Sequence, residues 1–134
     1  RARRNGAHII QGRPIESSKT IKRLHGTADR LLLDVPCSGL GTLRRNPDAK
    51  WKLSSDFIDK VRDTQAEILR SYSKILRPGG QMVYATCSIL PSENEGQVER
   101  FLAENPDFEL LAQQKISPAK HGFDGFFMAR LTKK

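Results

Sequence analysis

The chain has 134 residues and a hydrophobic share of 37%, enough for one domain, or part of one, with a modest core. No apolar run approaches the roughly 18 residues of a membrane span, and the basic start lacks the apolar segment of a signal peptide, so we expect no membrane association. Two cysteines are too few for a disulfide framework, which favours a reducing, cytoplasmic compartment.

The net charge of +8 is unevenly distributed along the chain. Residues 1–52 hold twelve Lys and Arg against four Asp and Glu, whereas residues 53–134 hold eleven of each. A solvated basic face would explain this, but Lys and Arg also neutralise phosphates and so provide affinity for nucleic acid. The three histidines are scattered without metal-ligand spacing, and we predict no metal site.

Hydrophobic periodicity and turn residues predict an α/β chain with a largely parallel sheet. The predicted elements begin with the tail of a basic helix at 1–5, a short strand at 8–11, and a loop and short helix up to 24. A buried strand at 30–34 follows, then a tight loop at 36–42, a basic loop at 43–53 and a long helix at 54–76. The last predicted elements are a second buried strand at 81–86, a helix that begins with a capping box at 92–95, and two late strands at 108–111 and 125–131.

Each cysteine follows a predicted buried strand. Cys37 lies in Asp-Val-Pro-Cys-Ser-Gly (34–39), and Cys87 lies in Ala-Thr-Cys-Ser (85–88). Ligands bind at the carboxyl ends of strands in open α/β sheets, so two thiols delivered there suggest covalent chemistry, with one attacking and one assisting. Two alternatives remain open, an inert buried cysteine in an ordinary turn and a redox-active pair, although no Cys-x-x-Cys spacing is present.

The motifs taken together resemble the Sun/Fmu family of RNA cytosine-5 methyltransferases, which use S-adenosylmethionine. The residues that carry the resemblance are Asp-Val-Pro-Cys-Ser-Gly-Leu-Gly (34–41), Arg-Arg-Asn-Pro-Asp (44–48), Thr-Gln (64–65), Ile-Leu (68–69), Ala-Thr-Cys-Ser (85–88), Glu-Asn-Glu (93–95) and Asp-Gly-Phe-Phe (124–127). They occur in order over most of the chain. The resemblance implies a Rossmann-like methyltransferase fold.

The resemblance also implies roles for individual residues. Cys87 would attack cytosine C6, Cys37 would assist release of the product, and Asp34 would lie near the cofactor and the target base. Candidate substrate contacts are Pro36, Arg44, Arg45 and Asn46. DNA cytosine-5 methyltransferases attack with the Pro-Cys cysteine but lack a second cysteine at a Thr-Cys-Ser position, which this chain has. Amino-group methyltransferases carry an Asn/Asp-Pro-Pro-aromatic loop where this chain reads Asp-Val-Pro-Cys (34–37), so neither pattern matches.

The family's glycine-rich cofactor loop has no counterpart between Arg1 and Lys134. We therefore expect residues 1–134 to form the C-terminal half of a catalytic domain, with the cofactor-loop half upstream. The expected substrate is ribosomal RNA, with transfer RNA as a second candidate. The alternative function is a non-catalytic RNA-binding fragment, and a fragment with an unpaired strand edge is expected to self-associate.

Overall fold

The computed structural model describes residues 3–134, which form a two-layer α/β arrangement. The helices are α1 (Ser18–Lys22), α2 (Ala49–Lys52), α3 (Ser55–Tyr72), α4 (Glu95–Glu104) and α5 (Pro118–His121). The strands are β1 (Ala28–Asp34), β2 (Leu76–Thr86), β3 (Phe108–Ile116) and β4 (Phe126–Lys133). Within this described range, no helix is both long and apolar enough to cross a membrane.

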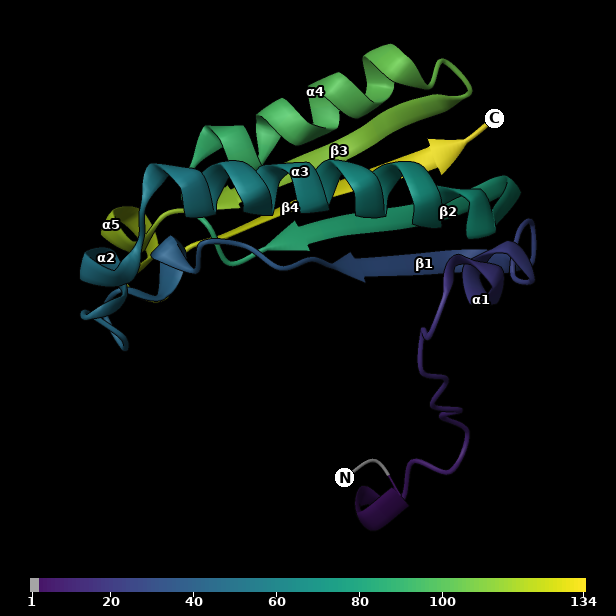
Figure 1. The fold of residues 1–134 in the computed structure, drawn as a ribbon, viewed down its shortest axis with the longest axis horizontal. Coiled ribbons are helices and arrows are strands. Elements are labelled where there is room, and N and C mark those ends of the chain that lie inside the picture. The colour runs from purple at the N-terminus through teal and green to yellow at the C-terminus, as the bar shows by residue number, and fades with distance from the viewer. Residues whose placement is uncertain (1–2) are drawn as a thin grey trace.

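The four strands form one mixed sheet in the order β1-β2-β4-β3. Strands β1 and β2 are parallel, β4 is antiparallel to β2, and β3 is antiparallel to β4. The prediction of a largely parallel sheet is therefore wrong for these four strands, because only the two strands that precede the cysteines pair in parallel and the two late strands pair antiparallel. The carboxyl ends of β1 and β2 meet at one end of the sheet, the end where α2 and α5 also lie (Figure 1).

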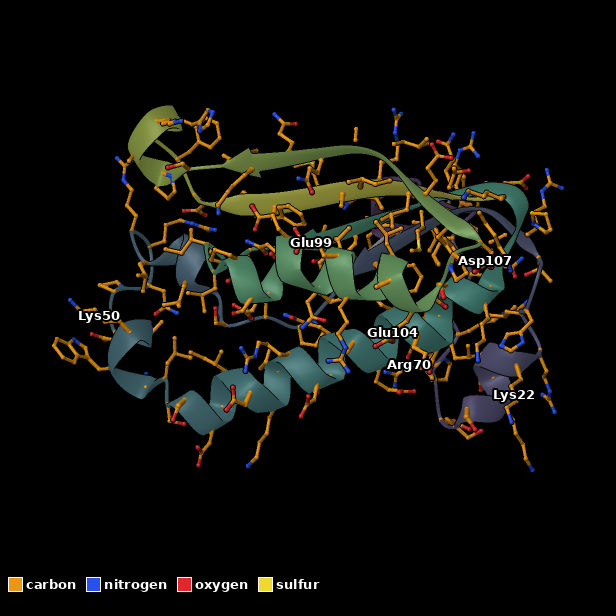
Figure 2. The ribbon with its side chains drawn as sticks, turned by 90° about the horizontal axis from the view of Figure 1, so that it is seen from above. Lys22, Lys50, Arg70, Glu99, Glu104 and Asp107 are labelled. Atoms are coloured by element: carbon orange, nitrogen blue, oxygen red, sulfur yellow. The ribbon has the colours of Figure 1, made fainter. Side chains whose placement is uncertain are left out.

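The core lies between one face of the sheet and helices α3 and α4, which cover that face (Figures 1 and 2). Alternation along β2 directs Met82 and Tyr84 into this layer, where both are completely buried. Spacing of four residues places Val61, Gln65 and Leu69 on the buried stripe of α3. A polar glutamine in an apolar stripe needs hydrogen-bond partners, and Gln65 Nε2 finds two of them at the candidate site, whereas Gln65 Oε1 has none among the described residues.

The predicted strand at 8–11 is wrong. Residues 3–17 extend away from the sheet, and Ile9 and Ile10 are 94% and 59% exposed, so nothing in the described chain supplies the packing that a strand requires (Figure 1). Of the predicted basic helix tail, residues 3–5 form one 3-10 turn, and Arg1 and Ala2 lie outside the described residues. Helix α1 is anchored by Ile21, which is buried.

Three further element boundaries differ from prediction. The long helix ends at Tyr72, and β2 already begins at Leu76. The basic loop at 43–53 contains the short helix α2. The predicted capping box is wrong, because Asn94 occupies the cap position of α4 without a side-chain capping bond. Its side chain instead bonds to the loop that carries Cys87.

Strand β1 forms one edge of the sheet in the described chain, and only part of it is buried. Leu33 points toward the helices and is 4% exposed, whereas Leu32 points to the opposite face and is 68% exposed. The prediction of a fully buried strand is therefore wrong for this face. An apolar side chain left exposed beside an open edge is typical of a surface that another segment covers.

Candidate functional site

The two cysteines converge at the carboxyl ends of β1 and β2. Asp34 pairs with Ala85 in the parallel ladder, so the two strands leave the sheet side by side. The Sγ atoms of Cys37 and Cys87 then lie 3.2 Å apart, and both residues are half-buried. Two thiols that are fifty residues apart in the chain therefore lie side by side, as predicted from their positions after the two strands.

The environment of Cys37 keeps its thiol protonated. Burial, assisted by the hydrogen bond with Cys87, raises the pKa of Cys37 from 9.0 to about 12. A redox-active or attacking cysteine requires a thiolate near neutral pH, which a raised pKa disfavours. Cys37 is therefore suited to donate a hydrogen bond to a neighbouring sulfur and poorly suited to attack.

A buried carboxylate holds the two cysteine loops together. Glu93 is completely buried, and its Oε1 accepts hydrogen bonds from Ser38 N at 2.7 Å and Gln65 Nε2 at 3.2 Å. Its Oε2 accepts hydrogen bonds from Ser38 Oγ at 2.6 Å and from Ser88 Oγ. Four hydrogen bonds therefore satisfy the two oxygens of this buried carboxyl group. The two serines directly follow the two cysteines, so Glu93 fixes both thiol positions at once.

A second layer of hydrogen bonds fixes this carboxylate and its partners. Tyr84 Oη donates to the Glu93 carbonyl at 2.7 Å, and burial raises the pKa of this phenol. Gln65 Nε2 also donates to the carbonyl of Pro36 at 2.9 Å. Asn94 Nδ2 donates to the Ser88 carbonyl at 3.0 Å. The site is therefore attached to β2, α3 and the start of α4.

Gly41 joins three segments at the site through its backbone. Its N–H donates to the Cys87 carbonyl at 2.9 Å, and its carbonyl accepts from Gly125 N–H at 2.8 Å. A Cβ at this position would lie against the Gly125 carbonyl and 2.7 Å from the Cys87 oxygen. Only glycine permits so close an approach of three backbones.

The other predicted site residues surround the thiols on exposed positions. Asp34 is exposed at the end of β1, and Pro36 is exposed one residue before Cys37. Arg44, Arg45 and Asn46 are exposed on the loop that precedes α2. The structure thus brings the predicted residues to one end of the sheet, and their individual roles stay predictions.

Two of the arginines are held by the loop between α5 and β4. The Arg44 guanidinium donates to the Gly122 carbonyl. Arg45 Nε donates to Asp124 Oδ2 at 2.7 Å, and Asp124 raises the pKa of Arg45, with a further contribution from the charge of Cys87. The arginine loop is therefore positioned against the 122–126 segment and close to the thiols.

Sequence reasoning assigned no role to Glu93, Gln65 or Asp124. All three lie within the motifs that carried the family resemblance, but the spacing of three residues from Ser92 drew attention to Glu95 instead. The available signal was a serine directly after each cysteine, because buried hydroxyls need hydrogen-bond partners and Glu93 accepts from both.

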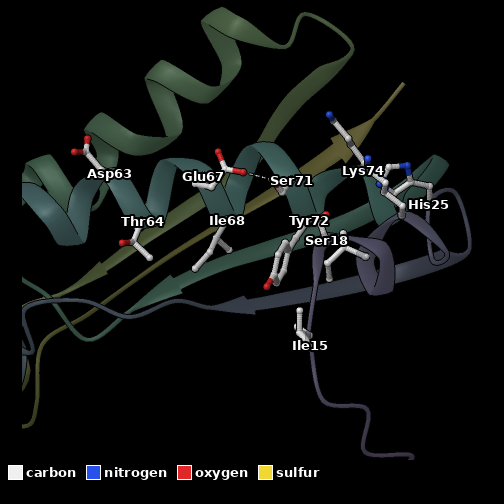
Figure 3. Close-up of a pocket in the computed structure, with 12 residues that line it drawn as sticks. Ile15, Ser18, His25, Asp63, Thr64, Glu67, Ile68, Ser71, Tyr72 and Lys74 are labelled. Atoms are coloured by element: carbon white, nitrogen blue, oxygen red, sulfur yellow. Dashed lines mark hydrogen bonds between the residues drawn. The ribbon is translucent and has the colours of Figure 1, made fainter.

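A cavity of about 550 Å³ lies away from this site, between the N-terminal segment and α3 (Figure 3). Ile15, Ile68 and Tyr72 contribute its apolar surface, and Glu67 and Lys74 lie at its margin. It includes neither cysteine, so it is a separate groove beside the edge strand β1.

Comparisons with known proteins agree with the fold. The chain matches the family model described as 16S rRNA methyltransferase RsmB/F over residues 6–132. It resembles the crystal structure of PH0851 with a TM-score of 0.93 and 32% identity, covering 98% of this chain and 33% of that one. The fold is that of the Rossmann-like methyltransferases. The chain belongs to the 16S rRNA methyltransferase RsmB/F family, which confirms the Sun/Fmu resemblance.

Two further relatives extend this comparison. Ribosomal RNA small subunit methyltransferase B of Klebsiella pneumoniae (strain 342) is 49% identical over 114 residues, which cover 79% of this chain and 26% of the relative. The crystal structure of NSun6 from Pyrococcus horikoshii with SFG has a TM-score of 0.84 and 27% identity, covering 98% of this chain and 36% of that one. The chain thus spans about a quarter of the length of the curated relatives it matches.

Replacing Glu93 by glutamine should destabilise the full-length protein by about 2 kcal/mol, because an amide would direct a donor at groups that themselves donate. Urea unfolding measures this loss. Glu99→Gln is the matched control on the exposed side of helix α4, which begins two residues after Glu93, and we expect it to change stability by less than about 0.5 kcal/mol. Equal stability of the two variants would contradict the role of Glu93.

Gly41→Ala should destabilise the protein by roughly 1 to 3 kcal/mol, because the added methyl group overlaps backbone atoms of two other segments. Thermal or urea unfolding gives the size of the effect. Gly12→Ala is the control, since an added Cβ there meets nothing within 4 Å. A neutral Gly41→Ala would mean that the three segments are not held this closely.

Alkylation by iodoacetamide should distinguish native from unfolded Cys37. Below pH 9 little thiolate is present in either state, and between pH 9 and 12 the unfolded thiol ionises while native Cys37 stays protonated. At pH 9 about half of the unfolded thiol is ionised against about a thousandth of native Cys37, and this contrast becomes smaller as the pH rises toward 12. Peptide mass mapping measures modification of Cys37, and equal rates in native protein and in urea would contradict the protonated state.

Proposed function

We propose that the protein containing this chain transfers a methyl group from S-adenosylmethionine to C5 of cytosine in RNA, with ribosomal RNA as substrate. The observation that carries the proposal is the 3.2 Å separation of Cys37 and Cys87 at the carboxyl ends of two parallel strands. Family membership and the rRNA methyltransferase names of the relatives support it. Transfer RNA is the alternative substrate.

The proposed reaction begins at Cys87. Its thiolate adds to C6 of cytosine, and the electron pair of the C5–C6 double bond moves to C5, which becomes nucleophilic. S-adenosylmethionine supplies the methyl group when bound. The proton on C5 then passes to solvent, the C5–C6 double bond forms again, and the bond between C6 and sulfur breaks with its electron pair returning to Cys87. Attack is assigned to Cys87 because the raised pKa of Cys37 disfavours a Cys37 thiolate.

Cys37 is proposed to assist this last step. Its Sγ lies 3.2 Å from Cys87 Sγ, so its protonated thiol can donate a hydrogen bond to the departing thiolate. That bond stabilises the leaving group, and so it favours release of the methylated base. Glu93 takes no direct part in this reaction. It fixes the positions of the two cysteine loops relative to each other.

Residues 1–134 are proposed to contribute only part of the cofactor-binding site. Asp34 ends strand β1 with an exposed carboxylate, which fits a ligand amine or hydroxyl in the crevice at this end of the sheet. We propose that residues 1–134 are part of a catalytic domain whose other half contributes the remaining contacts and covers the open edge of β1 and Leu32. The exposure of Leu32 and the matched quarter of the relatives support this.

A binding function without catalysis is the second candidate for residues 1–134 taken alone, favoured by the basic residues near the thiols and the partial cofactor-binding site. Self-association through the open edge of β1 belongs to the same proposal. Calorimetric titration of residues 1–134 with S-adenosylmethionine separates the candidates. Tight binding would mean that these residues form a sufficient cofactor site by themselves, which would contradict the binding function without catalysis. For the whole protein we propose a cytoplasmic location.

Cysteine variants of the full-length protein test the proposed reaction. Cys87→Ala should abolish methylation and form no covalent RNA adduct, because nothing attacks C6. Cys37→Ala should still attack and methylate but release the product slowly, so a protein–RNA adduct should accumulate. A denaturing gel detects that adduct as a slowly migrating band. Adduct with Cys87→Ala but not with Cys37→Ala would reverse the two roles, and unchanged activity of both variants would refute thiol catalysis.

A further inference from the structure

A small pocket beside the thiols is formed by arginine and aromatic side chains. We call it the arginine–aromatic pocket, and it is lined by Arg44, Arg45, Gly122, Phe123, Asp124 and Phe126. Its volume is about 310 Å³. Phe123 and Phe126 are 56% and 37% exposed, although large apolar rings gain free energy by being covered.

Two backbone hydrogen bonds connect this pocket to the reactive end of the sheet. Gly125, between the pocket residues Asp124 and Phe126, donates to the Gly41 carbonyl at 2.8 Å, and Gly41 donates to the Cys87 carbonyl at 2.9 Å. The backbone of Gly41 therefore connects the pocket segment to the loop that carries Cys87. A nucleotide neighbouring a base bound at Cys87 could reach it.

The pocket side chains are held before any ligand binds. Arg45 is paired with Asp124, whose side chain is 11% exposed, and the Arg44 guanidinium donates to Gly122. Held guanidinium planes and exposed rings are the groups on which unpaired RNA bases stack. Lys50 and Lys52 are exposed on the neighbouring helix α2 and add positive charge for phosphates.

We infer that the arginine–aromatic pocket binds an unpaired RNA base that flanks the target cytidine, with Phe123 as its main stacking surface. This inference rests on the proposed function, because it places the target base at Cys87. Extruding a target base from a stack also separates its neighbours, and a stacking pocket for one neighbour stabilises the extruded state. The pocket thereby selects RNA in which that neighbour is free of base pairing.

The test measures RNA affinity without relying on methylation. The full-length protein is titrated by fluorescence anisotropy with a labelled single-stranded RNA of about 12 nucleotides that carries one central cytidine. Each flanking position is replaced in turn by an abasic nucleotide. We expect one position to weaken binding by roughly 5- to 150-fold in the unsubstituted protein and to have no effect in Phe123→Ala.

Two variants accompany Phe123→Ala. Phe123→Tyr keeps the ring and should restore the dependence on that position. Leu111→Ala removes an exposed apolar side chain from β3 outside the pocket and should leave both affinity and position dependence unchanged.

Three outcomes would overturn the inference. The first is no detectable RNA binding, and the second is equal affinity of the unsubstituted protein for all the abasic RNAs. The third is that Phe123→Ala lowers the affinity for every RNA by the same factor. Loss of stability in Phe123→Ala with unchanged RNA dependence would mean that another segment of the protein covers the pocket. A separate methylation assay distinguishes the two proposals, because position-dependent binding without methyl transfer would refute only the proposed function.

Discussion

The site depends on one buried carboxylate. Glu93 accepts hydrogen bonds from both serines that follow the cysteines, and so it couples two loops that the chain separates by fifty residues. A buried carboxyl group is costly unless its oxygens are hydrogen-bonded, and here four hydrogen bonds satisfy it. Any movement of one cysteine loop would remove donors from this carboxylate, so the 3.2 Å spacing of the thiols is maintained by the same free energy that stabilises the fold.

The sheet explains why chemistry gathers at only one end of the molecule. Parallel pairing of β1 and β2 brings both strand ends to the same edge, and antiparallel β4 starts there and supplies the segment that bonds to Gly41. The two arginines then join from the loop before α2. Three distant segments thus contribute to one surface that combines thiols, cations and aromatic rings.

Burial affects the chemistry that is open to Cys37. Its thiol is desolvated and hydrogen-bonded to Cys87, which raises the pKa of Cys37 to about 12 and suits this thiol to donate a hydrogen bond. The edge of β1 and the side chain of Leu32 are both accessible in the described structure.

The sequence by itself determined the strands that end at the cysteines, the long helix and the family, because apolar periodicity and short motifs are local properties. It misplaced the strand at 8–11 and the capping box, since a strand needs a partner and a cap depends on where the side chain turns. Only the tertiary structure decided the roles of Glu93 and Gly41 and the position of Phe123. These depend on contacts between segments far apart in the chain, which no local pattern records.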